Sequence, residues 1–141
     1  MSGEVVHFEL PADNPERARK FYAKTFGWKM NPIPEADYTM VGTAAVDGEG
    51  RPKEPGTING GLAKRQGPLQ HPVVTIIVDE ISDAEKTIEK NGGKVVQKKS
   101  PIGDGSMGYT AYFTDPEGNV VGLFQLSGRW AGSGPGKASR S

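Results

Sequence analysis

Cysteine is absent from the 141-residue chain, and histidine occurs only twice, as His7 and His71. The lack of cysteine excludes a disulfide framework, a thiolate metal centre and a cysteine nucleophile. Any metal site would have to be built from these two imidazoles and from carboxylates. Histidine acid–base chemistry is limited to the same two positions.

The chain also lacks a surplus of charge of either sign and lacks a long apolar run. Its 17 basic and 17 acidic residues cancel to a formal net charge of zero, so nothing steers it to nucleic acid or anionic lipid. No window approaches the roughly 18 consecutive apolar residues of a transmembrane helix, and the first residues do not resemble a signal peptide. We expect a cytoplasmic protein with no nucleic-acid or membrane partner, and its hydrophobic content of 35% suffices for a core.

What the sequence does contain is an internal repeat. A shift of 66 residues aligns the start of the chain with its middle, and a shift of 61 residues aligns two later segments. The first shift pairs Leu10 with Ile76, Asp13 with Asp79, Ala18 with Ala84 and Gly27 with Gly93, and the second pairs Gly61 with Gly122 and Leu62 with Leu123. The repeat predicts two modules of the same design, with their difference in length absorbed in a loop.

Each half is predicted to contain a strand, a helix and further strands. The first helix should begin at Pro15 after the cap Asn14 and end at Gly27. In the second half Ser82 and Glu85 form a capping box, and the helix should end at residues 91–93. The strands are expected at residues 5–10, 38–46, 57–64, 73–78, 109–114 and 119–126, with a type I turn at 115–118.

Two polar segments accompany these elements. Residues 47–56 are predicted to connect two strands of the first half, either as a mobile lid over a site or as a solvated hairpin connection. Residues 127–141 are rich in glycine and serine, and we expect them to form a flexible tail.

Three stretches together resemble one known family. They are VVHFELPADNPERARKFYAKTFGW, VDEISDAEKTIEKNGG and YFTDPEGNVVGLFQ, within residues 5–126. The chain is similar to the vicinal oxygen chelate superfamily, which includes glyoxalase I, bleomycin resistance proteins and extradiol dioxygenases. The resemblance implies an α+β fold of two βαβββ modules, about residues 5–65 and 71–126, which form a cup-shaped curved mixed sheet with the helices outside. It also implies a bound small molecule and favours a homodimer.

Metal-using members of this family place one ligand on the first strand and one acid on the last strand of each module. The corresponding positions here are His7, Gly61, Val73 and Gly122, of which only His7 carries a ligating atom. A catalytic divalent ion needs about three protein ligands. We therefore expect no metal and no other cofactor.

The residues leave one alternative metal site open. Alternation along a strand places His7 and Glu9 on the same face, so the pair could supply two ligands or a coupled acid and base. His71 could add a third ligand for zinc, nickel, manganese or iron, although Pro72 disfavours a strand there. The other interpretation is a hydrogen-bonded strand histidine and a surface histidine.

The expected ligand-binding residues come from both modules. They are His7, Glu9, Gly61, Val73, Thr75, Tyr109 and Gly122, with His7 and Glu9 as candidate catalytic residues. The two glycines either enlarge the site or relieve crowding between strands. We expect a small-molecule-binding or resistance-type protein without the usual metal. The alternatives are a metal-dependent glyoxalase-type lyase, isomerase or dioxygenase that uses His7 with unconventional ligands, and an interaction protein whose cup is filled by side chains.

Overall fold

The computed structural model describes residues 3–127. The predicted tail at 127–141 therefore lies outside the described residues, except for Ser127. The chain divides into two compact units, Val6–Val73 and the segment from Val74 onward together with the residues up to Val5. Within residues 3–127, no helix is long and apolar enough to cross a membrane.

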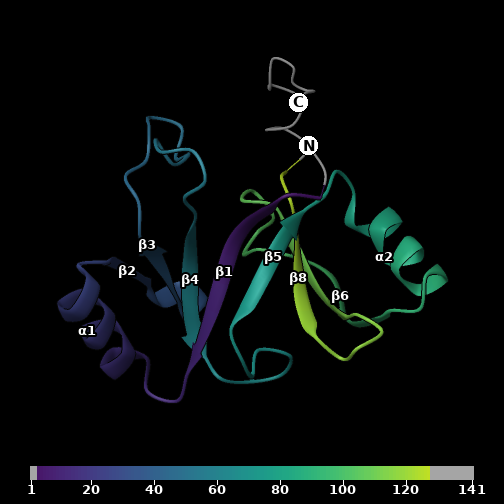
Figure 1. The fold of residues 1–141 in the computed structure, drawn as a ribbon, viewed down its shortest axis with the longest axis horizontal. Helices are drawn as coiled ribbons and strands as arrows, with labels where there is room; N and C mark the ends of the chain where they lie inside the picture. The colour runs from purple at the N-terminus through teal and green to yellow at the C-terminus, as the bar shows by residue number, and fades with distance from the viewer. Residues whose placement is uncertain (1–2, 128–141) are drawn as a thin grey trace. The chain divides into compact units, whose positions relative to one another are not determined.

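The first module has the order strand, helix and three strands (Figure 1). Its elements are β1 (Val5–Ala12), α1 (Pro15–Phe26), β2 (Lys29–Ile33), the 3₁₀ helix η1 (Pro34–Ala36), β3 (Tyr38–Gly42) and β4 (Asn59–Lys64). The strands lie side by side in the order β2-β3-β4-β1. β1 runs parallel to β4, and the other neighbours are antiparallel.

The second module repeats this design. Its elements are β5 (Val73–Ile77), α2 (Ile81–Lys90), β6 (Lys94–Pro101), β7 (Tyr109–Thr114) and β8 (Val120–Gln125). The strand order is β5-β8-β7-β6, with β5 parallel to β8 and the other pairs antiparallel. The predicted fold of two βαβββ modules is confirmed.

The strand registers agree with the shifts found in the sequence. Glu9 of β1 is opposite Gly61 of β4, and Thr75 of β5 is opposite Gly122 of β8. These two pairs are related by the 66-residue shift on the first strands and the 61-residue shift on the last strands. The repeat in the sequence is thus a repeat in hydrogen-bonding register.

Helix α1 begins and ends as the sequence predicts. The Asn14 side chain accepts a hydrogen bond from the backbone N–H of Arg17 at 3.0 Å, and Pro15 is the first helical residue. Gly27 stops the helix in the left-handed conformation, with φ of 74°. No α1 residue is fully buried, but Ala18 and Tyr22 pack against the buried core of the first module.

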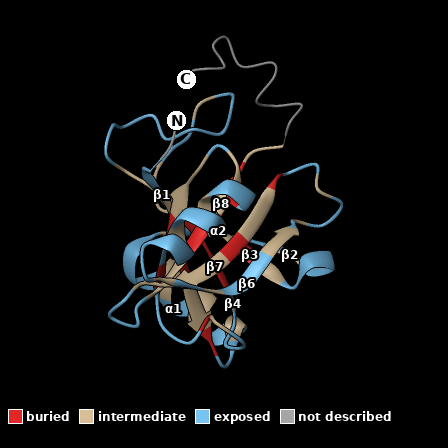
Figure 2. Ribbon diagram, turned by 90° about the vertical axis from the view of Figure 1, so that its right-hand side faces the viewer, coloured by how far each residue is buried: buried red, intermediate tan, exposed pale blue. Residues whose placement is uncertain are grey.

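Helix α2 begins two residues earlier than the predicted capping box at Ser82 implies. The cap is Glu80, whose carboxylate accepts from the Ser82 N–H at 3.3 Å. Ile81 is completely buried against Ala111 and Leu123, so its burial fixes the start of the helix. In Figure 2 the face of α2 toward the viewer is coloured mainly as exposed. Buried positions lie mainly on the strands.

The connection from β3 to β4 starts earlier than predicted. β3 ends at Gly42, because the Asn59 side chain accepts from the backbone N–H groups of Thr43 at 2.7 Å and Ala44 at 2.9 Å. Further along, the Asp47 carboxylate accepts from the Glu49 and Arg51 N–H groups and closes a local turn. That this loop acts as a lid stays a prediction.

The Asn14 cap provides a direct test of the α1 boundary. We expect Asn14→Ala to lower the free energy of unfolding by about 1 kcal/mol, because it leaves a helix N–H without its acceptor. Asn14→Asp keeps the acceptor and should retain nearly full stability. Urea denaturation measures both, and an Ala variant as stable as the Asp variant would show that the cap is unimportant.

Candidate functional site

His7 and Glu9 lie side by side on the face of the first sheet that points away from α1. Phe8 and Leu10, which alternate with them along β1, pack against the core beneath α1. Glu9 is opposite Gly61 on the neighbouring strand β4. Glu9 is only 8% exposed, so this face holds a buried carboxylate beside an imidazole.

Tyr38, the first residue of β3, links these two side chains. Its hydroxyl donates a hydrogen bond to Oε2 of Glu9 at 3.0 Å and lies 3.0 Å from Nε2 of His7. Because the hydroxyl proton is directed at Glu9, the Tyr38 oxygen accepts from the Nε2–H of His7. In the neutral imidazole the other nitrogen, Nδ1, then carries no proton and is a hydrogen-bond acceptor.

Gly61 provides the space that the Tyr38 ring occupies. Met40 of β3 is opposite Gly61, and Tyr38 lies two residues before it on the same face of the strand. A Cβ atom added at Gly61 would collide with the hydroxyl and the ring of Tyr38. The glycine therefore permits the close approach of the phenol, which favours relief of crowding over an enlarged site.

The electrostatics of this cluster centre on His7. Burial lowers the pKa of His7 below its usual 6.5, and the nearby Glu9 carboxylate opposes that effect by favouring the charged imidazolium. Since burial is the larger effect, the imidazole is neutral at pH 7. The cluster thus combines a neutral base, a phenol and a buried carboxyl group joined by hydrogen bonds.

In the second module, Thr75 and Gly122 occupy the positions of Glu9 and Gly61. Thr75 is 5% exposed and lies opposite Gly122, where an added Cβ would be 2.9 Å from the Thr75 hydroxyl oxygen. Tyr112 of β7 is directly opposite Gly122 on its other side. A hydroxyl group thus takes the position that a carboxylate holds in the first module.

Tyr109, one of the predicted ligand-binding residues, does not lie on this face. It packs on the α2 side of the sheet against the buried residues Ala111 and Leu123. Lys99 extends over its ring, with Nζ 4.7 Å from the ring centre. Because alternate residues of a strand point to opposite faces, the tyrosine that accompanies Thr75 and Gly122 is Tyr112. A ligand-binding role for Tyr109 stays a prediction.

The remaining predicted residues do not assemble a metal site. Val73 begins β5 and is 2% exposed, while His71 is exposed and precedes that strand. No three histidine, aspartate or glutamate side chains within residues 3–127 are placed to hold a metal ion. The alternative ligand set of His7, Glu9 and His71 is therefore not brought together.

The side chains at the family's usual metal positions do not fit an ion either. Gly61, Val73 and Gly122 offer no ligating atom, and Nε2 of His7 is engaged by Tyr38. The Tyr38 ring fills the space of a side chain at Gly61. A catalytic ion needs about three protein ligands and an open position, which this donor set does not supply.

Sequence reasoning missed Tyr38, the residue that organises the cluster. The signal for it was indirect: Gly61 leaves a gap on the face of His7 and Glu9, and an aromatic residue opens the preceding strand. The register of β3 against β4 was needed to bring that aromatic ring to the gap.

The contact between Gly61 and Tyr38 can be tested by a double-mutant cycle. We expect Gly61→Ala to cost about 1–3 kcal/mol of stability, because the new methyl group overpacks against the phenol. In the Tyr38→Ala background the cost should fall, since the phenol is gone. Gly48→Ala, where an added Cβ meets no atom within 4 Å, is the control. Equal costs in both backgrounds, measured by urea unfolding, would refute the contact.

The effect of Glu9 on the pKa of His7 provides a second test of the polar cluster. Glu9→Gln removes the carboxylate that favours the imidazolium, so the pKa of His7 should fall further below 6.5. In the wild type, the unfolded chain binds a proton more readily than the folded chain, so stability should drop as pH falls from 6.5 toward the folded-state pKa.

NMR titration of the His7 Cε1–H signal measures this pKa, and His7→Gln assigns the signal by removing it. A pKa that rises in the Glu9→Gln variant would contradict the arrangement described here. Urea unfolding across the same pH range checks the stability, which should depend less on pH in His7→Gln.

Comparisons with known proteins agree with this fold. Residues 4–44 match the family model described as bleomycin resistance protein-like N-terminal, a segment that contains His7, Glu9 and Tyr38. A glyoxylase-like domain-containing protein of Didymella fabae is 28% identical over 132 residues, which cover 92% of this chain and 98% of that protein. CFP32 of Mycobacterium bovis, which carries a provisional glyoxylase name, is 31% identical over 127 residues.

The match to CFP32 covers 84% of this chain but only 44% of the mycobacterial protein, so the chain spans less than half of that relative. Among solved structures, a glyoxalase/bleomycin resistance protein/dioxygenase superfamily member from Vibrio splendidus has a TM-score of 0.54 at 14% identity, covering 88% of this chain and 98% of its own. Together with the two βαβββ modules, these matches support the resemblance of the chain to the vicinal oxygen chelate superfamily.

Proposed function

We propose that this protein binds a small molecule without a metal ion, using the polar face of the first module. The observation that carries the proposal is the Tyr38 hydroxyl, which lies between His7 and Glu9 and fills the space beside Gly61. In the metal-using members of the family that the chain resembles, an acidic metal ligand occupies the position that corresponds to Gly61. A phenol held by two hydrogen bonds there favours recognition by hydrogen bonding over coordination of an ion.

The chemistry of the cluster indicates how it would hold a ligand. Nδ1 of His7 offers an acceptor, while the Tyr38 hydroxyl is fixed in direction by its bond to Glu9. Hydrogen bonds in such a buried setting are electrostatically stronger than in water and are oriented before the ligand arrives. A ligand with a hydroxyl or amide donor would suit Nδ1.

A metal-dependent lyase, isomerase or dioxygenase is the second candidate function. It is favoured by the presence of an imidazole and a carboxylate on one face and by the glyoxylase names of the relatives. For that function an ion would have to displace Tyr38 and recruit further ligands. The donor set supports it less than it supports metal-free binding.

A thermal-shift experiment separates the two functions, because a bound ion stabilises the folded protein. We expect Zn²⁺, Ni²⁺, Mn²⁺ and Fe²⁺ to give the same small shifts in the wild type, in His7→Ala and in the matched control His71→Ala. A large shift that is lost in His7→Ala and kept in His71→Ala would establish the metal-dependent function instead.

The binding function itself is tested by screening a panel of small metabolites and drugs in EDTA with ligand-observed NMR. We expect at least one compound to bind in EDTA, with its affinity reduced in His7→Ala and in Tyr38→Phe but unchanged in His71→Ala. Binding that appears only after a metal is added back would contradict the proposal.

A further inference from the structure

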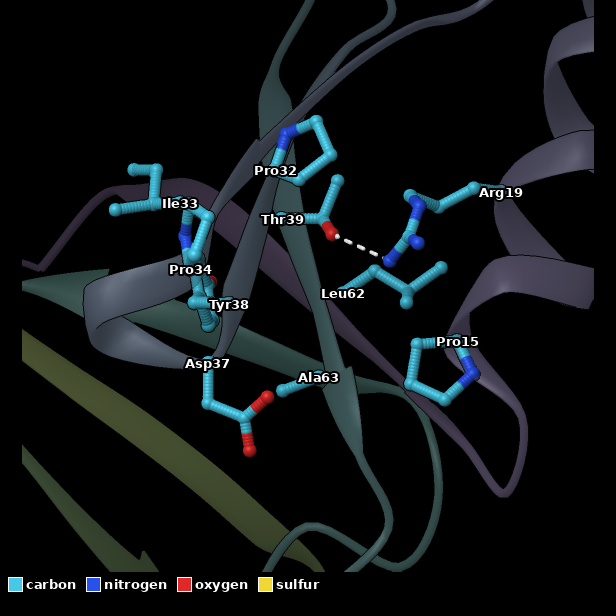
Figure 3. Close-up of a pocket in the computed structure, with 10 residues that line it drawn as sticks. All are labelled: Pro15, Arg19, Pro32, Ile33, Pro34, Asp37, Tyr38, Thr39, Leu62 and Ala63. Atoms are coloured by element: carbon cyan, nitrogen blue, oxygen red, sulfur yellow. Dashed lines mark hydrogen bonds between the residues drawn. The ribbon is translucent and has the colours of Figure 1, made fainter.

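A pocket lies on the opposite face of the first sheet, between α1, η1 and the strands β3 and β4 (Figure 3). Its volume is about 210 Å³. Apolar side chains make most of its wall, namely Pro15, Pro32, Ile33, Pro34 and Leu62. Tyr38 and Thr39 both line the pocket. The Tyr38 hydroxyl belongs to the polar cluster, so the pocket adjoins that cluster at Tyr38.

Arg19 of α1 brings a guanidinium group into this pocket (Figure 3). Its Nη1 donates to the hydroxyl of the buried Thr39 at 3.3 Å, a long hydrogen bond to a neutral acceptor. No carboxylate within residues 3–127 pairs with it, and the nearest acidic residue on the same helix, Glu16, pairs with Lys20 at 3.6 Å. Among the residues that the structure describes, only the Thr39 hydroxyl accepts from the Arg19 guanidinium, which carries five N–H donors.

A half-buried guanidinium of this kind favours an anionic partner. Arginine is rarely buried unless it is paired, and its planar fork matches a carboxylate with two parallel hydrogen bonds. The Thr39 hydroxyl accepts a hydrogen bond from Nη1 of Arg19 and so fixes one edge of the planar guanidinium group. The other edge of the guanidinium group would bind an anion, and the apolar wall of the pocket would contact an apolar body.

Asp37 limits the charge of that molecule. Figure 3 shows its carboxylate across the pocket from Arg19, with Ala63 and Leu62 between them. A second negative charge on the ligand would be repelled by Asp37, so a monocarboxylate is favoured over a dicarboxylate or a phosphate. The volume is smaller than the roughly 300–1,000 Å³ of a drug-sized site, which limits the ligand to a small acid.

We propose that this pocket binds a small monocarboxylic acid with an apolar body. The carboxylate pairs with the Arg19 fork beside Thr39, and the apolar body lies against the proline, isoleucine and leucine side chains. The groups that would hold the carboxylate, Arg19 and Thr39, are not part of the polar cluster, so the proposal stands whether or not that cluster binds a ligand without metal.

The test is a titration with sodium benzoate followed by backbone amide NMR signals, at ionic strength matched with sodium chloride. We expect saturable shifts at Thr39, Leu62 and Ala63 in the wild type. Arg19→Gln should weaken the affinity by about tenfold or more, as expected for a lost charge-assisted bond. Asp37→Asn should bind benzoate more tightly, because the opposing charge is removed.

Arg17→Gln is the matched control, because Arg17 is an exposed arginine on the same helix and does not line this pocket. It should bind benzoate like the wild type, whereas benzamide and inorganic phosphate should give no saturable shifts at the pocket residues. Arg19→Lys keeps the charge without the fork and should bind with intermediate affinity, which covers the case of an unstable Gln variant. Shifts that do not saturate, or equal affinity in Arg19→Gln and Arg17→Gln, would overturn the proposal.

Discussion

The hydroxyl of Tyr38 bridges an imidazole and a carboxylate on the face of the first module away from α1, and the rest of this face depends on that bridge. Glu9 is almost fully buried, and a buried carboxyl group without a partner costs several kcal/mol. The hydrogen bond from Tyr38 offsets this cost, and the bond from His7 satisfies the phenol oxygen. Gly61 makes the bridge possible, because any side chain there would displace the ring. Three strands, β1, β3 and β4, are thereby tied together by polar side chains as well as by their ladders.

The two modules differ in the polar groups that they carry at equivalent positions. The second module has a threonine and a glycine where the first has a glutamate and a glycine, so the repeat has kept its register while its polar groups differ. The two faces of the first sheet carry different chemical groups. One face carries the His7, Tyr38 and Glu9 cluster, and the other carries a small apolar pocket with one arginine beside it.

The sequence allowed the repeat, the strand pairing and α1 to be predicted, because each leaves a local or periodic signal. Pro15 and Gly27 mark their helix ends through backbone conformations that few other residues favour. The edge strands β2 and β6 left no such signal, since lysines and prolines interrupt their alternation. The predicted start of α2 was wrong, because the burial of Ile81 outweighed the preference of Ser82 for a cap position. Tyr38 could not be predicted, because its role depends on a register between strands that are far apart in sequence.

The most direct test of the central claim is a crystal structure of the protein grown with excess Zn²⁺. The account predicts that the Tyr38 hydroxyl remains at hydrogen-bond distance from both Nε2 of His7 and Oε2 of Glu9, with no ion between them. Density for a cation coordinated by His7 and Glu9, with the Tyr38 ring turned away from Gly61, would contradict it.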